Sequence, residues 1–270
     1  MRQLEAFISE YPDQTISVAM HDLETDREIL INANQDFHPA STIKVHVMME
    51  VFRQLKEGLF RIEDRVPIIN SFTSIADENK YSLDVKDDSE KSLYQRLGDN
   101  ETVLELTRLM IVQSSNLATN ILIEKIDAKN VNTFIKSLGI EDVTVQRGVE
   151  DGAAFRLGLN NKATANGLTQ TMKLIAQGDV VSKEASRQMI NIMLGQQFNE
   201  GIPAGLPNST KVAHKTGWTG QFYHDTGIVF PEKRKPYAIS IMTHGFPEDN
   251  EKPAHACMAD ISKMIYEQIS

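Results

Sequence analysis

The pattern of hydrophobic and polar positions predicts strands near both ends of the chain. Residues 15–20 alternate as a half-buried strand does, and a turn at 22–27 leads to a second short run at 28–31, so we expect a hairpin. Three more strand-like runs, separated by turn residues, follow near the C-terminus at 210–216, 226–230 and 237–243. Since the hairpin needs partners, we predict one antiparallel five-stranded sheet.

A helical period appears at the termini and through the middle of the chain. Helices are expected at 2–10 and 253–268, where they would flank the sheet. Between them, helical patterns cover 41–59, 101–126, 164–177 and 183–194. The second of these is interrupted near 112–116, where Ser115 or Asn116 can cap a new helix. The predicted fold class is therefore α/β (α+β): an antiparallel sheet with terminal helices plus an all-helical lobe.

The order of these elements predicts a discontinuous domain. Residues 1–38 and 205–270 are expected to form the α/β lobe, and residues 39–204 the all-helical lobe, with the active site in the crevice between them. The polar stretch from 62 to 99 follows no single period, so we interpret it as loop with short helices. A loop of that length often has a functional role.

Composition and charge exclude several classes of protein. A hydrophobic content of 41% and a charged content of 24% are ordinary for a soluble globular chain. A net charge of −9 without a basic stripe argues against a nucleic-acid partner. No apolar run is long enough to span a membrane. No signal peptide is visible, so we expect a cytoplasmic protein, or a secreted or periplasmic one if the natural chain carries a leader.

Ser41 and Lys44 stand three residues apart at the start of an apolar, methionine-rich segment. On a helix they share one face, so the lysine can deprotonate the serine. A serine hydroxyl is a poor nucleophile without a base, and lysine serves as one only if burial or nearby cations lower its pKa. Taken alone, this spacing is common and indicates little.

Two further motifs follow in order. Ser114 and Asn116 lie at the helix break, and Lys215-Thr216-Gly217 lies at the end of a predicted strand. There a lysine, a hydroxyl and a glycine offer a cation for an anion and a strand edge for a substrate backbone. The set S-x-x-K, S-D-N and K-T-G is the signature of class A β-lactamases and penicillin-binding proteins. The chain resembles this superfamily over nearly its whole length.

The resemblance implies a role for each matching residue. Ser41 is expected to be the acylated nucleophile, Lys44 its base, and Ser114 the group that passes a proton to the leaving nitrogen. The expected substrate-binding residues are Asn116 for an amide, Lys215, Thr216 and Gly217 at the strand edge, Trp218 with its backbone N–H in an oxyanion hole beside that of Ser41, and His224.

The resemblance also implies a glutamate that activates the hydrolytic water, and Glu150 is the candidate. Three positions depart from the family pattern. Ala154 stands where the family has an asparagine in E-x-x-L-N, Ser115 where it usually has aspartate, and His224 where many members have arginine. We therefore expect acylation to be better supported than fast β-lactam turnover.

The leading hypothesis is a serine hydrolase that forms an acyl-enzyme on Ser41 with a small β-lactam or related carbonyl substrate. A D,D-peptidase or esterase with slow deacylation is an alternative, and a non-catalytic ligand-binding sensor domain is another. No cofactor is expected. No metal site is expected either, because the remaining histidines lack paired ligand spacing. The lone Cys257 permits no internal disulfide and is expected to be buried packing.

Overall fold

The computed structural model describes residues 2–269 and divides into two compact units. The first, here called the sheet unit, combines the N-terminal segment up to Thr42 with the segment from Lys162 onward. The second, the helical unit, is Ile43–Asn161. The predicted boundary differs, because it placed residues 162–204 with the helices.

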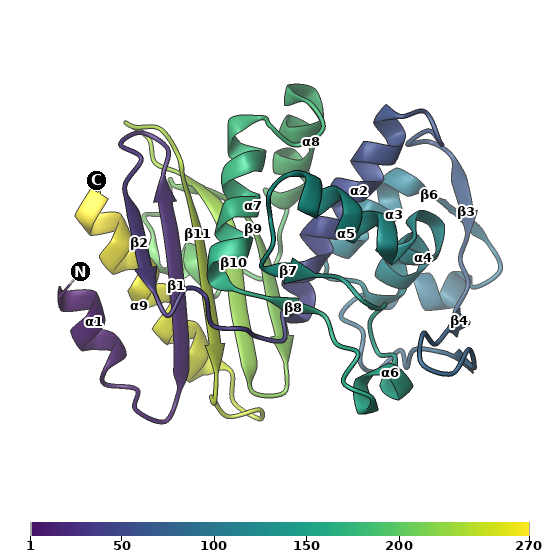
Figure 1. The fold of residues 1–270 in the computed structure, drawn as a ribbon, viewed down its shortest axis with the longest axis horizontal. Helices are drawn as coiled ribbons and strands as arrows, with labels where there is room; N and C mark the ends of the chain where they lie inside the picture. The colour runs from purple at the N-terminus through teal and green to yellow at the C-terminus, as the bar shows by residue number, and fades with distance from the viewer. Residues whose placement is uncertain (1, 270) are drawn as a thin grey trace. The chain divides into compact units, whose positions relative to one another are not determined.

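The sheet unit is built on five antiparallel strands, as predicted (Figure 1). Their order is β2-β1-β11-β10-β9, so the N-terminal hairpin joins the C-terminal strands through β1 and β11. The strands are β1 (Thr15–Asp22), β2 (Glu28–Ile31), β9 (Lys211–Thr219), β10 (Phe222–Phe230) and β11 (Tyr237–His244). The fold class is therefore confirmed.

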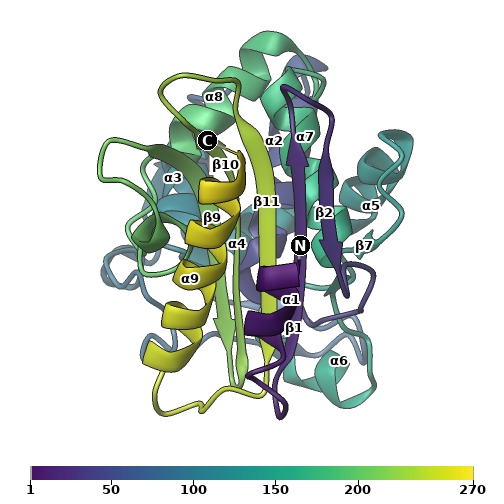
Figure 2. The ribbon, with the colours of Figure 1, turned by 90° about the vertical axis from the view of Figure 1, so that its left-hand side faces the viewer.

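Helices cover both faces of this sheet (Figures 1 and 2). One face carries α1 (Arg2–Ile8) and α9 (Lys252–Ile269), and the other carries α7 (Ala165–Gln177) and α8 (Lys183–Met193). The alternating side chains Ile16, Val18 and Met20 of β1 share a buried cluster with Cys257 of α9. Helix α7 contacts β1, β10 and β11, which explains why residues after 162 belong to the sheet unit.

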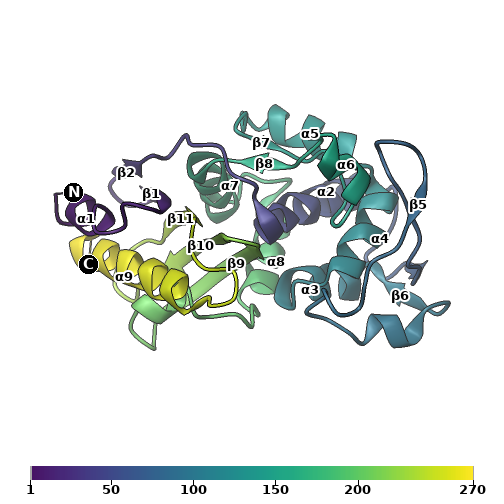
Figure 3. The same cartoon turned by 90° about the horizontal axis from the view of Figure 1, so that it is seen from below.

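The helical unit surrounds α2 (Lys44–Lys56), whose side chains are buried over most of its length. Helix α2 contacts α3, α4 and α5 (Figure 3). These are α3 (Val103–Val112), α4 (Asn116–Ile126) and α5 (Ala128–Ser137), and a short α6 (Gly152–Arg156) follows. The predicted break between α3 and α4 is present, with Ser115 accepting from the Ala118 N–H. Helices α5 and α6 were not predicted: α5 is rich in lysine and asparagine, and α6 has only five residues.

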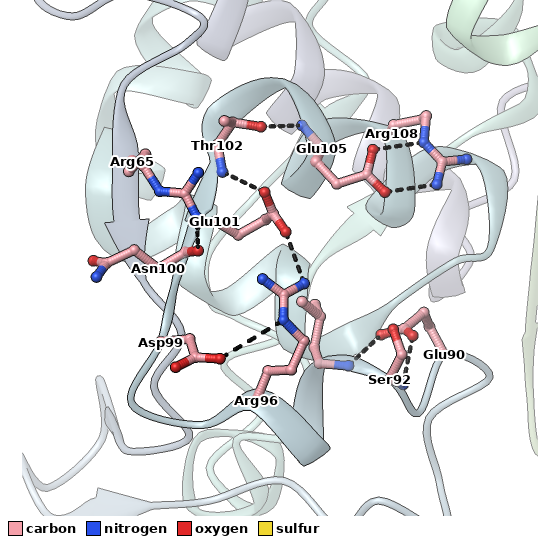
Figure 4. A network of polar contacts seen from close by, with 11 residues as sticks. Arg65, Glu90, Ser92, Arg96, Asp99, Asn100, Glu101, Thr102, Glu105 and Arg108 are labelled. Atoms are coloured by element: carbon pink, nitrogen blue, oxygen red, sulfur yellow. Dashed lines mark hydrogen bonds and ion pairs between the residues drawn. The ribbon is translucent and has the colours of Figure 1, made fainter.

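The polar stretch 62–99 is mainly loop, as predicted, but its regular pieces are mostly short strands. They are β3 (Arg65–Pro67), which pairs with β6 (Asn100–Thr102), β4 (Phe72–Thr73), which pairs with β5 (Lys80–Tyr81), and the 3-10 turn η2 (Leu93–Arg96). Acidic side chains hold this region together (Figure 4). Glu101 accepts from Arg96, and Glu90 accepts from the N–H groups of Ser92 and Leu93.

The remaining short elements are β7 (Val143–Thr144), β8 (Lys162–Ala163) and the 3-10 turns η1 (Ala40–Ile43) and η3 (Ile202–Gly205). Within residues 2–269, no helix is both long and apolar enough to cross a membrane.

Candidate active site

The turn that carries Ser41 is tightly held within the sheet unit. Ser41 lies in η1, and the preceding Ala40 has φ 47°, a left-handed conformation that is uncommon for a residue other than glycine. The Thr42 hydroxyl and N–H both donate to the carbonyl of Pro39, at 2.6 and 3.2 Å. Backbone strain of this kind persists only where surrounding contacts impose it, and it concentrates at functional sites.

Strand β9 runs directly against this turn. A Cβ added at Gly217 would lie 3.0 Å from the Ser41 and Thr42 nitrogens and from the Pro39 oxygen. Only glycine permits so close an approach of two backbones. The indole of Trp218 is exposed, and its N–H donates to the Gly220 carbonyl. The structure therefore brings the backbone of Gly217 against the turn that carries Ser41, and Trp218 directly follows Gly217 on β9.

Lys215 and His214 are adjacent on β9 and have different surroundings. Lys215 is fully buried, and its Nζ donates to the carbonyl of the partly buried Thr216 at 2.8 Å. His214 is also buried, with Nδ1 2.9 Å from Asp225 Oδ1 and Nε2 3.2 Å from Asn199 Oδ1. These two contacts give His214 a structural role inside the sheet unit.

The geometry of His224 does not support the carboxylate-binding role expected from the sequence. The ring is buried, and Nε2 lies 2.8 Å from the carbonyl of His38. At Nδ1, the N–H of Thr243 donates at 3.2 Å and the carbonyl of Tyr223 lies 2.8 Å away, so both ring nitrogens face backbone groups of the sheet unit. Burial lowers the pKa of His224 to about 4, which keeps the ring uncharged at neutral pH. His38 begins the turn that carries Ser41, so the contact between His224 and the His38 carbonyl helps to hold this turn in place.

Lys44 is the centre of a polar cluster within the helical unit. It is fully buried, and its Nζ donates to the Ser114 carbonyl at 2.6 Å and to Asn116 Oδ1 at 2.8 Å, with Ser114 Oγ 3.3 Å away. Burial lowers the pKa of Lys44 to about 7, although the carboxylates of Asp88 and Glu150 act in the opposite direction. A large fraction of this lysine is therefore neutral near pH 7, as a general base requires.

Ser114 reaches Lys44 because of its unusual backbone. It follows the end of α3 with φ 57°, in the left-handed region, and the next N–H, of Ser115, turns back to the Leu109 carbonyl. This reversal presents both the hydroxyl and the carbonyl of Ser114 to the Lys44 amine. Hydrophobic periodicity predicts the helix break but not this conformation.

Glu150 joins the same cluster through Asn116, whose Nδ2 donates to Glu150 Oε1 at 2.7 Å. Glu150 also has a left-handed backbone, with φ 60°. Partial burial of its carboxyl raises its pKa, and the nearby Asp87 and Asp88 act in the same direction. The residue as a whole keeps access to solvent. Lys44, Ser114, Asn116 and Glu150 thus form one connected network.

Sequence reasoning missed two residues that support this network. Asn120 holds the backbone just before Glu150, because its side chain accepts from the Val149 N–H at 2.8 Å and donates to the Val149 carbonyl at 3.0 Å. Asp88, from the polar stretch, accepts from the Leu117 N–H at 2.8 Å. The only signal for Asn120 was a polar residue on the buried face of a helix. Asp88 stands in a run of charges that reads as solvated loop.

Comparisons with known proteins agree with this fold and these motifs. A family model described as "Beta-lactamase enzyme family" matches residues 1–269. The extended-spectrum β-lactamase PER-1 of Pseudomonas aeruginosa is 23% identical over 269 residues, covering 94% of this chain and 82% of that protein. A β-lactamase of Bacillus subtilis is 23% identical over 258 residues, covering 94% of this chain and 79% of that protein.

Solved structures show the same fold. PBP-A superposes with a TM-score of 0.83 at 23% identity, covering 99% of this chain and 94% of that one. An ancestral class A β-lactamase superposes with a TM-score of 0.85 at 21% identity, covering 99% of both chains. The protein is a serine hydrolase of the β-lactamase-like class. Within that class, the chain belongs to the β-lactamase enzyme family.

Proposed function

We propose that Ser41 attacks a β-lactam carbonyl and that Lys44 takes its proton. The observation that carries the proposal is the pair of bonds from the buried Lys44 amine to the Ser114 carbonyl and to Asn116 Oδ1. A neutral amine has two N–H groups and one lone pair. Because the two closest acceptors use the N–H groups, the lone pair is left for a hydroxyl proton, and the Ser114 hydroxyl already lies 3.3 Å from the amine. Ser41 precedes Lys44 by three residues where η1 continues into α2.

Ser114 is proposed to return the proton to the leaving nitrogen, since its Oγ lies 3.3 Å from the amine that collects it. The backbone N–H groups of Ser41 and Trp218 are proposed to stabilise the oxyanion. Donors of this type each contribute on the order of 3 kcal/mol to acyl transfer. Lys215 and Thr216 are proposed to bind the substrate's anionic group, because Lys215 supplies a cation at the strand that packs against the Ser41 turn.

Glu150 is proposed to activate the water that releases the acyl group. Its raised pKa makes it a stronger base than an ordinary carboxylate, and Asn116 orients one of its oxygens. Position 154, where the family has an asparagine, is a buried alanine in the middle of α6, and its side chain is only a methyl group. We therefore propose that deacylation is slow, as in a penicillin-binding protein, relative to acylation.

Time-resolved intact-mass spectrometry with benzylpenicillin tests this function. Wild type is expected to gain the mass of one penicillin transiently, whereas Glu150→Gln retains the adduct for much longer and Ser41→Ala gains none. Glu141→Gln is the matched control, since Glu141 is an exposed carboxylate of the same unit, and it should behave as wild type. Equal persistence in wild type and Glu150→Gln would remove Glu150 from deacylation. Absence of any wild-type adduct would overturn the proposal.

A further inference from the structure

Asp88 is a buried carboxylate in the polar stretch that the mechanism above does not use. Its exposed fraction is 2%. Oδ2 accepts from the Leu117 N–H at 2.8 Å and from the Tyr94 hydroxyl at 3.0 Å, and Oδ1 accepts from the Glu90 N–H at 3.0 Å. A buried charge is costly unless hydrogen bonds compensate it, and these three donors do so.

The bond to Leu117 places Asp88 at the N-terminus of α4. The Ser115 hydroxyl accepts from the Ala118 N–H, and Asp88 takes the N–H just before it. A carboxylate there satisfies a helix donor that has no partner within the helix, and it interacts favourably with the helix dipole. Leu117 directly follows Asn116, the residue bonded to both Lys44 and Glu150. Asp88 therefore fixes the turn of α4 that carries Asn116.

Asp88 is itself held in place by its neighbours in the helical unit. Ser89 Oγ donates to the Gln113 carbonyl at 2.7 Å, at the junction of α3 and α4. Glu90 accepts from the N–H groups of Ser92 and Leu93 at the start of η2 (Figure 4). These contacts of the neighbouring residues hold the backbone on the C-terminal side of Asp88, so its carboxylate keeps its position at the N-terminus of α4.

The charge of Asp88 acts on the Lys44 amine. Within the helical unit, the charged groups that influence Lys44 are Asp88 and Glu150, and both favour its protonated form against the effect of burial. Glu150 is in turn influenced by Asp87 and Asp88. Position 115, where the family usually has aspartate, is a neutral serine here.

We propose that Asp88 is a positioning residue of the acylation site: it holds the first turn of α4, and with it the Asn116 side chain that contacts Lys44 and Glu150. The effect of Asp88 on the rate of acylation rests on the proposed function, whereas its effect on the protonation of Lys44 is present in the free protein. The two can therefore be measured separately.

Carbon-13 NMR of lysine Cε in the free protein reports the protonation of Lys44 directly, with its resonance assigned by its absence in Lys44→Arg. Asp88→Asn can keep an oxygen acceptor for Leu117 and Tyr94, but it loses the acceptor for the Glu90 N–H and removes the charge. The Lys44 titration should therefore move to lower pH by roughly one pH unit. Asp84→Asn removes an exposed charge from the same loop, where Asp84 accepts from the Lys86 N–H, and should leave the titration unchanged.

The rate of Ser41 acylation against pH gives the second readout. Its acid limb should move to lower pH with the Lys44 titration in Asp88→Asn, whereas a merely structural loss would lower the rate at every pH and leave the limb in place. Asp88→Ser is the second variant, and whichever variant keeps the wild-type circular dichroism is used. An unchanged Lys44 titration would overturn the inference. If wild type is not acylated at all, the proposed function fails while the NMR titration still decides on Asp88.

Discussion

Several side chains at the site owe their chemistry to their surroundings rather than to their type. Lys44 would carry a charge in water up to roughly pH 10.4. Buried, it titrates at about 7 and can act as a base. His224 loses its charge for the same reason. Its ring contacts the His38 and Tyr223 carbonyls and the Thr243 N–H, so an expected ligand-binding residue instead supports the Ser41 turn.

Gly217 allows a sharp test at this scale. In Gly217→Ala the new methyl would press on the Ser41 and Thr42 nitrogens, which are backbone atoms and cannot rotate away. We expect acylation of Ser41 to slow roughly 10- to 100-fold, because small displacements of a nucleophile are costly. Stopped-flow acylation with a chromogenic cephalosporin measures this.

The control for Gly217→Ala is Gly152→Ala. The nearest atom to that new methyl would be Arg156 Nη1 at 3.5 Å, an ordinary contact with a flexible side chain. An acylation rate equal to wild type in Gly217→Ala would show that the turn yields and that the close approach is not needed.

At the scale of elements, α4 organises the polar cluster around Lys44 within the helical unit. Its N-terminal residue Asn116 bonds Lys44 and Glu150, and Asn120, one turn later, bonds both backbone groups of Val149. A further clamp comes from Asp151, which accepts from the Ser74 hydroxyl and the Ile75 N–H. The loop before and after Glu150 is thus held by side chains, because it has little regular structure of its own.

Replacing Asn120 with alanine should therefore affect deacylation more than acylation. Asn120→Ala leaves the N–H and carbonyl of Val149 without these partners, at a cost of about 1 to 3 kcal/mol for each group. The position of Glu150 loosens, while Ser41 and Lys44 are untouched. We expect the acyl-enzyme to persist on the order of ten times longer, as followed by intact mass after removal of free penicillin.

Tyr81→Phe is the milder comparison, since the Tyr81 hydroxyl contributes only a 3.4 Å contact to the Val149 carbonyl and a 3.3 Å contact to Asn120. Its acyl-enzyme should persist little longer than that of wild type. If Asn120→Ala released the acyl group as fast as wild type, the loop would not depend on α4.

At the scale of the whole molecule, the sheet unit is assembled from the two ends of the chain. Arg234, in the turn between β10 and β11, donates to Asp22 at the end of β1 and to the Ile269 carbonyl at the end of α9. Burial disfavours the charge on Asp22, but hydrogen bonds from Thr25, Glu24 and Arg234 outweigh it, so its pKa is lowered. One guanidinium thus joins three distant segments.

Arg234→Met should reduce the free energy of unfolding by about 3 kcal/mol near pH 7, because it leaves the buried Asp22 carboxylate without its cation. The stabilisation is present above the unfolded-state pKa of roughly 3.9 and is lost as the pH falls through the lower folded-state value. The difference from wild type should therefore shrink in strong acid. Urea denaturation at several pH values measures it.

Lys233→Met provides the control for Arg234→Met, since Lys233 is an exposed cation in the same turn. Its stability should match wild type at each pH. A difference that stays constant from neutral to strongly acidic pH would exclude the ion pair with Asp22 as the cause.

The sequence by itself determined the strands, most helices and the catalytic motifs. Burial periodicity is a local property, and it predicts strands at 15–20 and 210–216 and a helix at 164–177, close to the observed β1, β9 and α7. The motif residues Ser41, Lys44, Ser114 and Lys215 are recognisable because their chemistry requires those residue types in that order. Helix α6 escaped detection because five residues carry no period.

Only the tertiary structure decided how the helices divide between the units, and which polar residues support the site. Helix α7 belongs to the sheet unit because it packs against β1 and β11. The sequence of α7 predicts a helix but does not predict which elements it packs against. Asp88 and Asn120 act through partners 29 residues away in sequence. The lowered pKa of Lys44 likewise arises from burial by segments distant along the chain. Long-range contacts create these properties, so local patterns in the sequence cannot show them.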